Sequence, residues 1–179
     1  GAAVTERLVR EVAAVALMLL GVLVAVALAS HSPLDPSPFH LSTLRDQPEN
    51  LAGWLGATLS AAVLGLLGLT AFLLPPLLAV GGWRMLTGVT VDRPRLLAFG
   101  WGVLVVALPG VLQLVCGELG LETDVVPCGG ALGGAEHALL GALVGPVGRV
   151  LVLAGFLLVG ALAISGASLA GTVDAGVGR

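Results

Sequence analysis

VAAVALMLLGVLVAVALA, residues 12–29, is a run of apolar residues without a single charge. As a helix it rises about 27 Å, close to the roughly 30 Å of hydrocarbon in a bilayer. Three further uncharged stretches follow, at residues 51–82, 96–115 and 150–168. A soluble fold of 179 residues has no use for four such runs, so the sequence predicts an all-α polytopic membrane protein.

The composition excludes several kinds of function. Charged residues make up 11% of the chain, against about 25% in ordinary soluble domains. All 8 basic residues are Arg, and a P-loop needs a Lys to reach nucleotide phosphates, so these residues hold no P-loop ATPase. The predicted span interiors carry no ionisable residue, which disfavours a pump or ion transporter. A net charge of −3 does not suggest nucleic-acid binding.

The arginines predict the orientation. With four spans and both termini cytoplasmic, most arginines lie inside, as the positive-inside bias requires. The inside set is Arg7, Arg10, Arg84, Arg93, Arg95 and Arg179, and the outside set is Arg45 and Arg149.

The second apolar stretch, residues 51–82, is ~48 Å long as a helix, too long for one upright span and too short for two. Trp54 and Trp83 bracket it, which fits one long helix with an aromatic ring at each membrane surface. An interfacial segment at about 51–60 before a shorter span fits as well, and gives spans at about 12–29, 60–82, 96–115 and 150–168. Pro75 and Pro76 lack backbone N–H groups and are expected to bend the helix.

A fifth helical segment is expected at about 131–144, too short to cross the bilayer and therefore re-entrant or interfacial. One face carries Leu132, Leu139, Leu140 and Leu143. The opposite face carries Gly134, Ala138, Gly141 and Gly145, and is expected to pack closely against the bundle. Glu136 lies on the leucine face, and we expect its carboxylate at the headgroup level.

Small residues also recur at intervals of four in the first and last spans: Gly21, Ala25 and Ala29, then Ala163, Ala167 and Gly171. This spacing suits close helix contacts, although a chain rich in Ala and Gly also produces it. Gln113 is expected at an interhelical hydrogen bond or at the membrane interface.

The loops offer few reactive side chains, and we predict no catalytic, cofactor-binding or metal-binding residues. His31, His40 and Asp35 could hold a metal, but their spacing is not that of a metal site, and solvated loop histidines, His137 among them, are the simpler interpretation. Glu118, Glu122 and Asp124 are more simply a solvated acidic loop than an enzyme site. Cys116 and Cys128 fall on the predicted outer side, where they form either a disulfide or two free thiols.

The ends of the chain suggest a longer protein. The chain begins with Gly1 and stops soon after the fourth span, so we expect a soluble portion beyond it. A cleaved signal peptide is an alternative for the first span, since residues 27–29 read Ala-Leu-Ala, but its apolar core exceeds the usual 7–15 residues.

Several short motifs carry a family resemblance. SHSPLDPS, residues 30–37, resembles the S-x-x-P-x-D-P-S loop of FtsK/SpoIIIE-type DNA translocases. NLAGWLGA, residues 50–57, and AFLLP, residues 71–75, are similar to the segment leading into that family's second span. CGGALG, residues 128–133, and GPVG, residues 145–148, are similar to the glycine pairs before its fourth span. Arg149 departs from the small or polar residue usual there, and is expected to snorkel to the headgroups.

The resemblance implies a non-catalytic anchor in the bacterial inner membrane, placed at the division septum. It implies a cytoplasmic hexameric motor, absent from these residues, that uses ATP and Mg²⁺ and alone contacts DNA. The anchor's expected partners are the lipid bilayer, other division proteins and further copies of itself, packed through the Gly/Ala faces. A small oligomeric transporter or channel subunit is the alternative, and a membrane-embedded enzyme a third.

Overall fold

The computed structural model describes residues 2–38, 47–88, 93–121 and 127–165, and its regular elements there are all helices. They are α1 (Ala2–Ala29), α2 (Gly53–Leu67), the 3₁₀ helix η1 (Gly68–Leu73), α3 (Leu74–Thr87), α4 (Pro94–Leu119) and α5 (Gly130–Ser165). Four helical stretches in this part of the chain are long and apolar enough to cross a membrane. The predicted all-α polytopic fold is confirmed.

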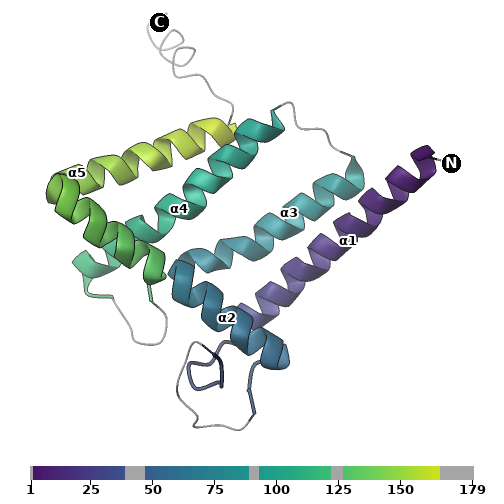
Figure 1. Ribbon diagram of the computed structural model, residues 1–179, viewed down its shortest axis with the longest axis horizontal. Coiled ribbons are helices and arrows are strands. Elements are labelled where there is room, and N and C mark those ends of the chain that lie inside the picture. The colour runs from purple at the N-terminus through teal and green to yellow at the C-terminus, as the bar shows by residue number, and fades with distance from the viewer. Residues whose placement is uncertain (1, 39–46, 89–92, 122–126, 166–179) are drawn as a thin grey trace, which may run out of the picture.

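Two antiparallel helix pairs make up the bundle (Figure 1). α1 lies against α3, and α4 lies against the second half of α5. The first residues of α1 and the last of α5 lie at the same end, which also carries Arg7, Arg10, Arg84, Arg93 and Arg95 and is called the arginine end. The opposite end, where α1 and α4 end and α2 begins, is called the loop end.

The backbone of α5 breaks at Gly145, whose φ of 71° and ψ of −177° lie outside any helix. Only glycine adopts this conformation readily, and Pro146 then begins a new helix in the position where its missing N–H is harmless. The first segment of α5, residues 130–144, crosses the loop end, and the second, residues 146–165, runs back to the arginine end (Figure 1). The break therefore comes directly after the expected helical segment at 131–144.

The second apolar stretch breaks at Gly68, so the structure does not have the single long helix that was one of the two arrangements allowed by the sequence. Gly68 has a φ of 58° and a ψ of −142°, and it ends α2 before η1 and α3 continue toward the arginine end. Pro75 and Pro76 were expected to bend the helix, but they fall in the first turn of α3, where backbone N–H groups need no helical partner. The break also lies several residues beyond the predicted boundary near residue 60.

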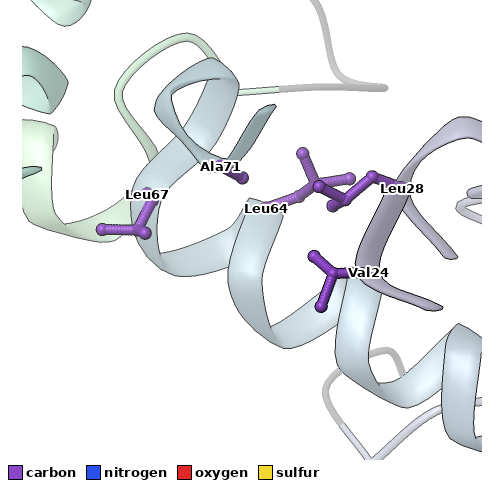
Figure 2. Close-up of a cluster of buried hydrophobic side chains, with 5 residues drawn as sticks. All are labelled: Val24, Leu28, Leu64, Leu67 and Ala71. Carbon is purple, nitrogen blue, oxygen red and sulfur yellow. The ribbon is translucent and has the colours of Figure 1, made fainter. Parts of the chain in front are cut away.

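A small apolar core lies where the two helix pairs meet. Val24 and Leu28 of α1 pack against Leu64, Leu67 and Ala71, and all five are buried (Figure 2). Figure 2 shows Leu28 and Leu64 pointing toward one another, with Val24 beside them. Val105 of α4 and Leu132 of α5 pack against the same cluster from the other pair. The cluster thus contributes van der Waals contact to both pairs, the main attraction left between helices in lipid.

The buried face of α1 differs from the one that the spacing of four predicted. Gly21 does pack: a Cβ there would lie 3.2 Å from the Pro75 carbonyl oxygen of α3. Ala25 and Ala29 are exposed, whereas Ala14 is fully buried. The contact follows a heptad-like spacing through Ala14 and Gly21 because two nearly antiparallel helices keep the same seam in contact every seven residues.

Glycines also let α4 and α5 approach closely. A Cβ on Gly100 would lie 2.9 Å from the Gly160 carbonyl oxygen and 2.9 Å from Ala163 Cβ, and a Cβ on Gly160 would lie 3.2 Å from the Gly100 carbonyl oxygen. The two backbones therefore touch at this crossing, as small-residue packing in membranes allows. Ala163 is part of this contact, while Ala167 and Gly171 lie outside the described residues.

The expected small-residue face of the first α5 segment is not the face that packs. No described atom lies within 4 Å of a Cβ built on Gly134, and Ala138 is exposed. Gly133 is buried instead, with Leu132 and Glu136 half-buried beside it. Because the Gly129–Gly130 turn enters the helix against α4, the face starting at Gly129 and continuing through Gly133 becomes the inner one.

Replacing Gly160 by Leu should destabilise the bundle by about 1–3 kcal/mol, because the larger side chain would collide with Leu104 and the Gly100 backbone. The matched control is Gly155→Leu in the same helix, where no described atom lies within 4 Å of a Cβ. Unfolding of the purified chain in detergent measures both. Equal stability of the two variants would contradict the close crossing.

Candidate functional site

No group of three His, Cys, Asp or Glu among the described residues is placed to hold a metal ion. His31 Nδ1 is hydrogen-bonded to Ser60 Oγ of α2 at 3.0 Å rather than solvated, and Asp35 is buried among backbone groups. His40 lies outside the described residues. At the loop end, side chains and backbone groups join separate parts of the chain at three sites.

The first site, the clasp, consists of Asp35 and Asn50, which are 3% and 4% exposed. The carboxylate of Asp35 accepts hydrogen bonds from the backbone N–H groups of Glu49 and Asn50 at 2.9 and 3.0 Å. Each of the two carboxylate oxygens thus accepts a hydrogen bond from the backbone, which offsets part of the cost of burying the carboxylate. This closes the loop between α1 and α2, whose residues 39–46 lie outside the described part.

Asn50 then fixes that loop to α1. Its side-chain amide donates to the carbonyl oxygens of Ala27 and Ser30, at 2.8 and 3.2 Å. The last carbonyls of a helix have no partner within the helix, and a buried one must find a donor elsewhere. The Oδ1 atom of Asn50 accepts the Ala52 N–H at 3.0 Å, so the same side chain also fixes the residue that directly precedes α2.

The clasp accounts for the sequence motif around Asn50. Gly53 has a φ of 63° where the chain turns into α2. A Cβ on Gly56 would lie 3.0 Å from Asn50 Cγ, so a larger residue there would push the amide away from α1. These residues carry part of the family resemblance, but their role in the clasp was not predicted. The signal in the sequence was the pair of polar residues Asp35 and Asn50 in the segment between the first two apolar runs.

The second site, the joint, is where the two helix pairs meet through backbone atoms. The Leu69 N–H, just past the break at Gly68, donates to the Cys128 carbonyl oxygen at 2.9 Å. A Cβ on Gly130 would lie 2.6 Å from both the Gly68 nitrogen and the Leu66 carbonyl oxygen. Gly68 and Gly130 thus fit against each other only as glycines.

A disulfide holds the joint to α4. Cys116 and Cys128 are bonded, with Cα atoms 6.3 Å apart, and both residues are buried. The bridge settles the choice that the sequence left open between a disulfide and two thiols. Gln113, one turn before Cys116, accepts the Gly129 N–H at 3.3 Å. It therefore makes the expected hydrogen bond between elements, to the turn that precedes α5.

The third site, the elbow, surrounds Gly145. Arg149 folds back over the first α5 segment, and its Nη1 donates to the His137 imidazole, with Nε2 2.7 Å away. Only an unprotonated ring nitrogen can accept such a bond. Glu136 is half-buried and packs against Gly110 of α4. Among the described residues, Glu136 Oε2 and Arg149 Nε find no hydrogen-bond partner although both atoms are buried.

Replacing Asn50 by Ala should cost about 1–3 kcal/mol of stability, because the Ala27 and Ser30 carbonyls would lose their donor. Gln47→Ala, which removes an exposed amide from the same loop, is the control and should have little effect. Thermal unfolding in detergent compares them. If Asn50→Ala were as stable as the control, the clasp would not be holding α1.

Reduction of Cys116–Cys128 should also destabilise the chain, by about 2–4 kcal/mol, because the bridge closes a loop with a sequence separation of 12. Melting curves with and without reductant measure this loss. The double variant Cys116→Ser/Cys128→Ser should melt like the reduced protein and ignore reductant. Alkylation of both thiols in unreduced protein, seen by mass spectrometry, would show that the bridge is absent.

Comparison with known proteins places these features in a family. The chain matches the family described as "4TM region of DNA translocase FtsK/SpoIIIE" over residues 6–176. A DNA translocase FtsK of Azospirillum brasilense is 36% identical over 101 residues, which cover 55% of this chain and 16% of that protein. A DNA translocase FtsK of Bradyrhizobium diazoefficiens is 32% identical over 149 residues, which cover 80% of this chain and 17% of that protein.

The chain therefore spans only a small part of the curated relatives that it matches, 16% and 17% of their lengths. No solved structure matches it. The family match covers nearly all of the residues that form the two helix pairs, the clasp, the joint and the elbow. This chain belongs to the FtsK/SpoIIIE family, as its four-helix membrane region.

Proposed function

We propose that this chain anchors a DNA-translocating motor at the division septum of the inner membrane, and that it associates there with further copies of itself. The matched region is the membrane region and not the motor, so this chain is itself non-catalytic. The motor, its ATP and Mg²⁺, and its DNA substrate belong in this proposal to other parts of a longer protein. The curated relatives, named DNA translocases, support that assignment.

The observation that carries the proposal is the position of the two described ends. α1 begins and α5 ends at the arginine end, beside Arg7, Arg10, Arg84, Arg93 and Arg95 (Figure 1). Arginines concentrate on the cytoplasmic side of membrane proteins. A motor joined after α5 would then share the compartment of the chromosome.

The disulfide independently supports this orientation. Cys116 and Cys128 lie at the loop end, opposite the arginines. Disulfides persist in oxidising compartments such as the bacterial periplasm and are rare in the cytosol. With the loop end in the periplasm and the arginine end in the cytoplasm, the disulfide lies in an oxidising compartment and the arginines lie on the cytoplasmic side.

Self-association needs surfaces that the chain has not already used. Gly21 and Ala163, two of the small residues that suggested such surfaces, are used within the chain, as are Gly100 and Gly160. A Cβ would meet no described atom within 4 Å at Gly65, Gly102, Gly134 and Gly155. We propose that copies pack through these open positions, in a hexamer matching the motor, and that other division proteins bind the exposed parts of the loop end.

Transport gains no support from the described residues. A cavity of about 480 Å³ between α4 and α5 is lined by the apolar residues Phe99, Gly102, Val103, Val106 and Phe156. An ion or polar substrate pathway normally carries polar groups. The cavity has the character of a lipid-facing groove.

Fusion of a fluorescent protein to either end tests the proposal in dividing cells. A reporter that fluoresces only in the cytoplasm should be bright at both ends, and the signal should collect at the septum. The control is a four-span protein of similar size with the same reporter, which should label the envelope evenly. Ends on opposite sides would overturn the anchor orientation, and an even envelope signal would overturn septal targeting.

A further inference from the structure

The two segments that cross the loop end, α2 and residues 130–144 of α5, are together called the crossing layer. Each has 15 residues and is ~22 Å long, too short to cross a bilayer. Without them the chain still has four adequate spans. These are α1 at ~42 Å, residues 68–87 at roughly 33 Å, α4 at ~39 Å and residues 146–165 at ~30 Å. The crossing layer is therefore free to lie along the membrane.

The backbone breaks turn both segments across the spans. Gly68 separates α2 from η1, and Gly145 separates the two segments of α5. Figure 1 shows α2 and the first α5 segment running across the ends of both helix pairs, roughly in one line. They meet at the joint, where Gly130 packs against Gly68.

α2 has two distinct faces. Its inner face, with Gly56, Ala57, Ser60, Ala61 and Leu64, is buried. Its start carries large apolar side chains outward: Leu51 is 82% exposed, Trp54 56% and Leu55 64%. A second set of exposed apolar side chains, Leu66, Leu69 and Phe72, lies where α2 passes into η1 and the following span. Large apolar side chains exposed at both ends of α2 point to lipid as its neighbour.

The polar residues of the crossing layer set its depth. Glu136 and His137 lie on the first α5 segment, and Arg149 follows four residues after the break. In the hydrocarbon centre such groups would be costly, while in water Trp54 and Leu55 would be exposed needlessly. The headgroup region accepts both kinds of side chain, and Trp is enriched there.

We propose that the crossing layer lies in the headgroup region at the loop end, and that Leu51, Trp54 and Leu55 insert into the lipid of that leaflet. The partner of Leu51, Trp54 and Leu55 is the phospholipid bilayer, not a second protein chain. The layer then holds the joint and the elbow at one membrane surface. This inference does not depend on septal targeting, since an evenly distributed anchor would place the layer at the same depth.

Fluorescence quenching by brominated lipids tests the depth of Trp54. The full chain with Trp83→Phe and Trp101→Phe keeps Trp54 as its single tryptophan. It is reconstituted in phosphatidylcholine–phosphatidylglycerol vesicles with bromine placed either near the carbonyl or near the end of the acyl chain. We expect the larger loss of emission with bromine near the carbonyl.

The matched control carries Phe156→Trp together with Trp54→Phe, Trp83→Phe and Trp101→Phe. Position 156 lies at the middle of the last span and is 48% exposed, so bromine near the chain end should quench it most. A Trp54 profile as deep as the control's would show that α2 enters the hydrocarbon and would overturn the proposal. Trp54 emission insensitive to both lipids would also overturn it, because water or a protein partner would then cover this face.

Discussion

Backbone polar groups cannot remain unpaired in hydrocarbon, and this constraint decides where the chain can depart from helix. The described breaks at Gly68 and Gly145 lie at the loop end, outside the helix pairs that run to the arginine end. At the first break the Leu69 N–H finds the Cys128 carbonyl. At the end of α1 the Asn50 amide supplies the missing donor. The clasp and the joint thus both supply hydrogen-bond partners to backbone groups that a helix leaves unpaired.

Within the bundle, close backbone approach replaces the hydrophobic effect, because lipid tails are as apolar as the side chains. Gly100 and Gly160 bring α4 against α5, and Gly82 brings α3 against α1, where a Cβ would lie 2.7 Å from the Ala14 carbonyl oxygen. Large apolar residues are left on the outside, including Leu19, Val22 and Leu151. At these two crossings small residues therefore lie inside and large ones outside, while the larger buried side chains gather in the cluster around Leu28 and Leu64.

Run length and charge predicted the four spans because hydropathy reports directly on the bilayer. The break at Gly68 could not be predicted in the same way, since Leu66, Leu69 and their neighbours read as one continuous apolar run. That break depends on the Cys128–Gly130 turn, which lies far along the chain and contacts it only in the fold. The packed faces of the first and fifth helical segments were predicted wrongly for a related reason. Small residues spaced by four reflect a chain rich in Ala and Gly, whereas the position of α3 decides that Ala14 and Gly21 are the small residues of α1 in contact.

The polar roles were the least predictable. Asp35 bonds backbone groups fourteen and fifteen residues away, and Asn50 reaches Ala27 across twenty-three. Such pairings of a side chain with distant main chain leave no periodic signal. The contacts of Glu136 with Gly110 of α4 and of Arg149 with His137 were likewise not predicted. Helical periodicity predicts on which face of its own helix a residue lies. It does not predict that the chain turns at Gly145 and brings Arg149 back to His137.

The described helix pairs approach each other through α2 and η1, while α1 and α3 on one side and α4 and the second α5 segment on the other keep mainly to their own partner. The two pairs are therefore joined chiefly at the loop end, where η1 meets the Cys128–Gly130 turn. A pull on the chain that leaves α5 would pass along the α4–α5 pair to this end, where the Cys116–Cys128 bond ties the turn before α5 covalently to α4.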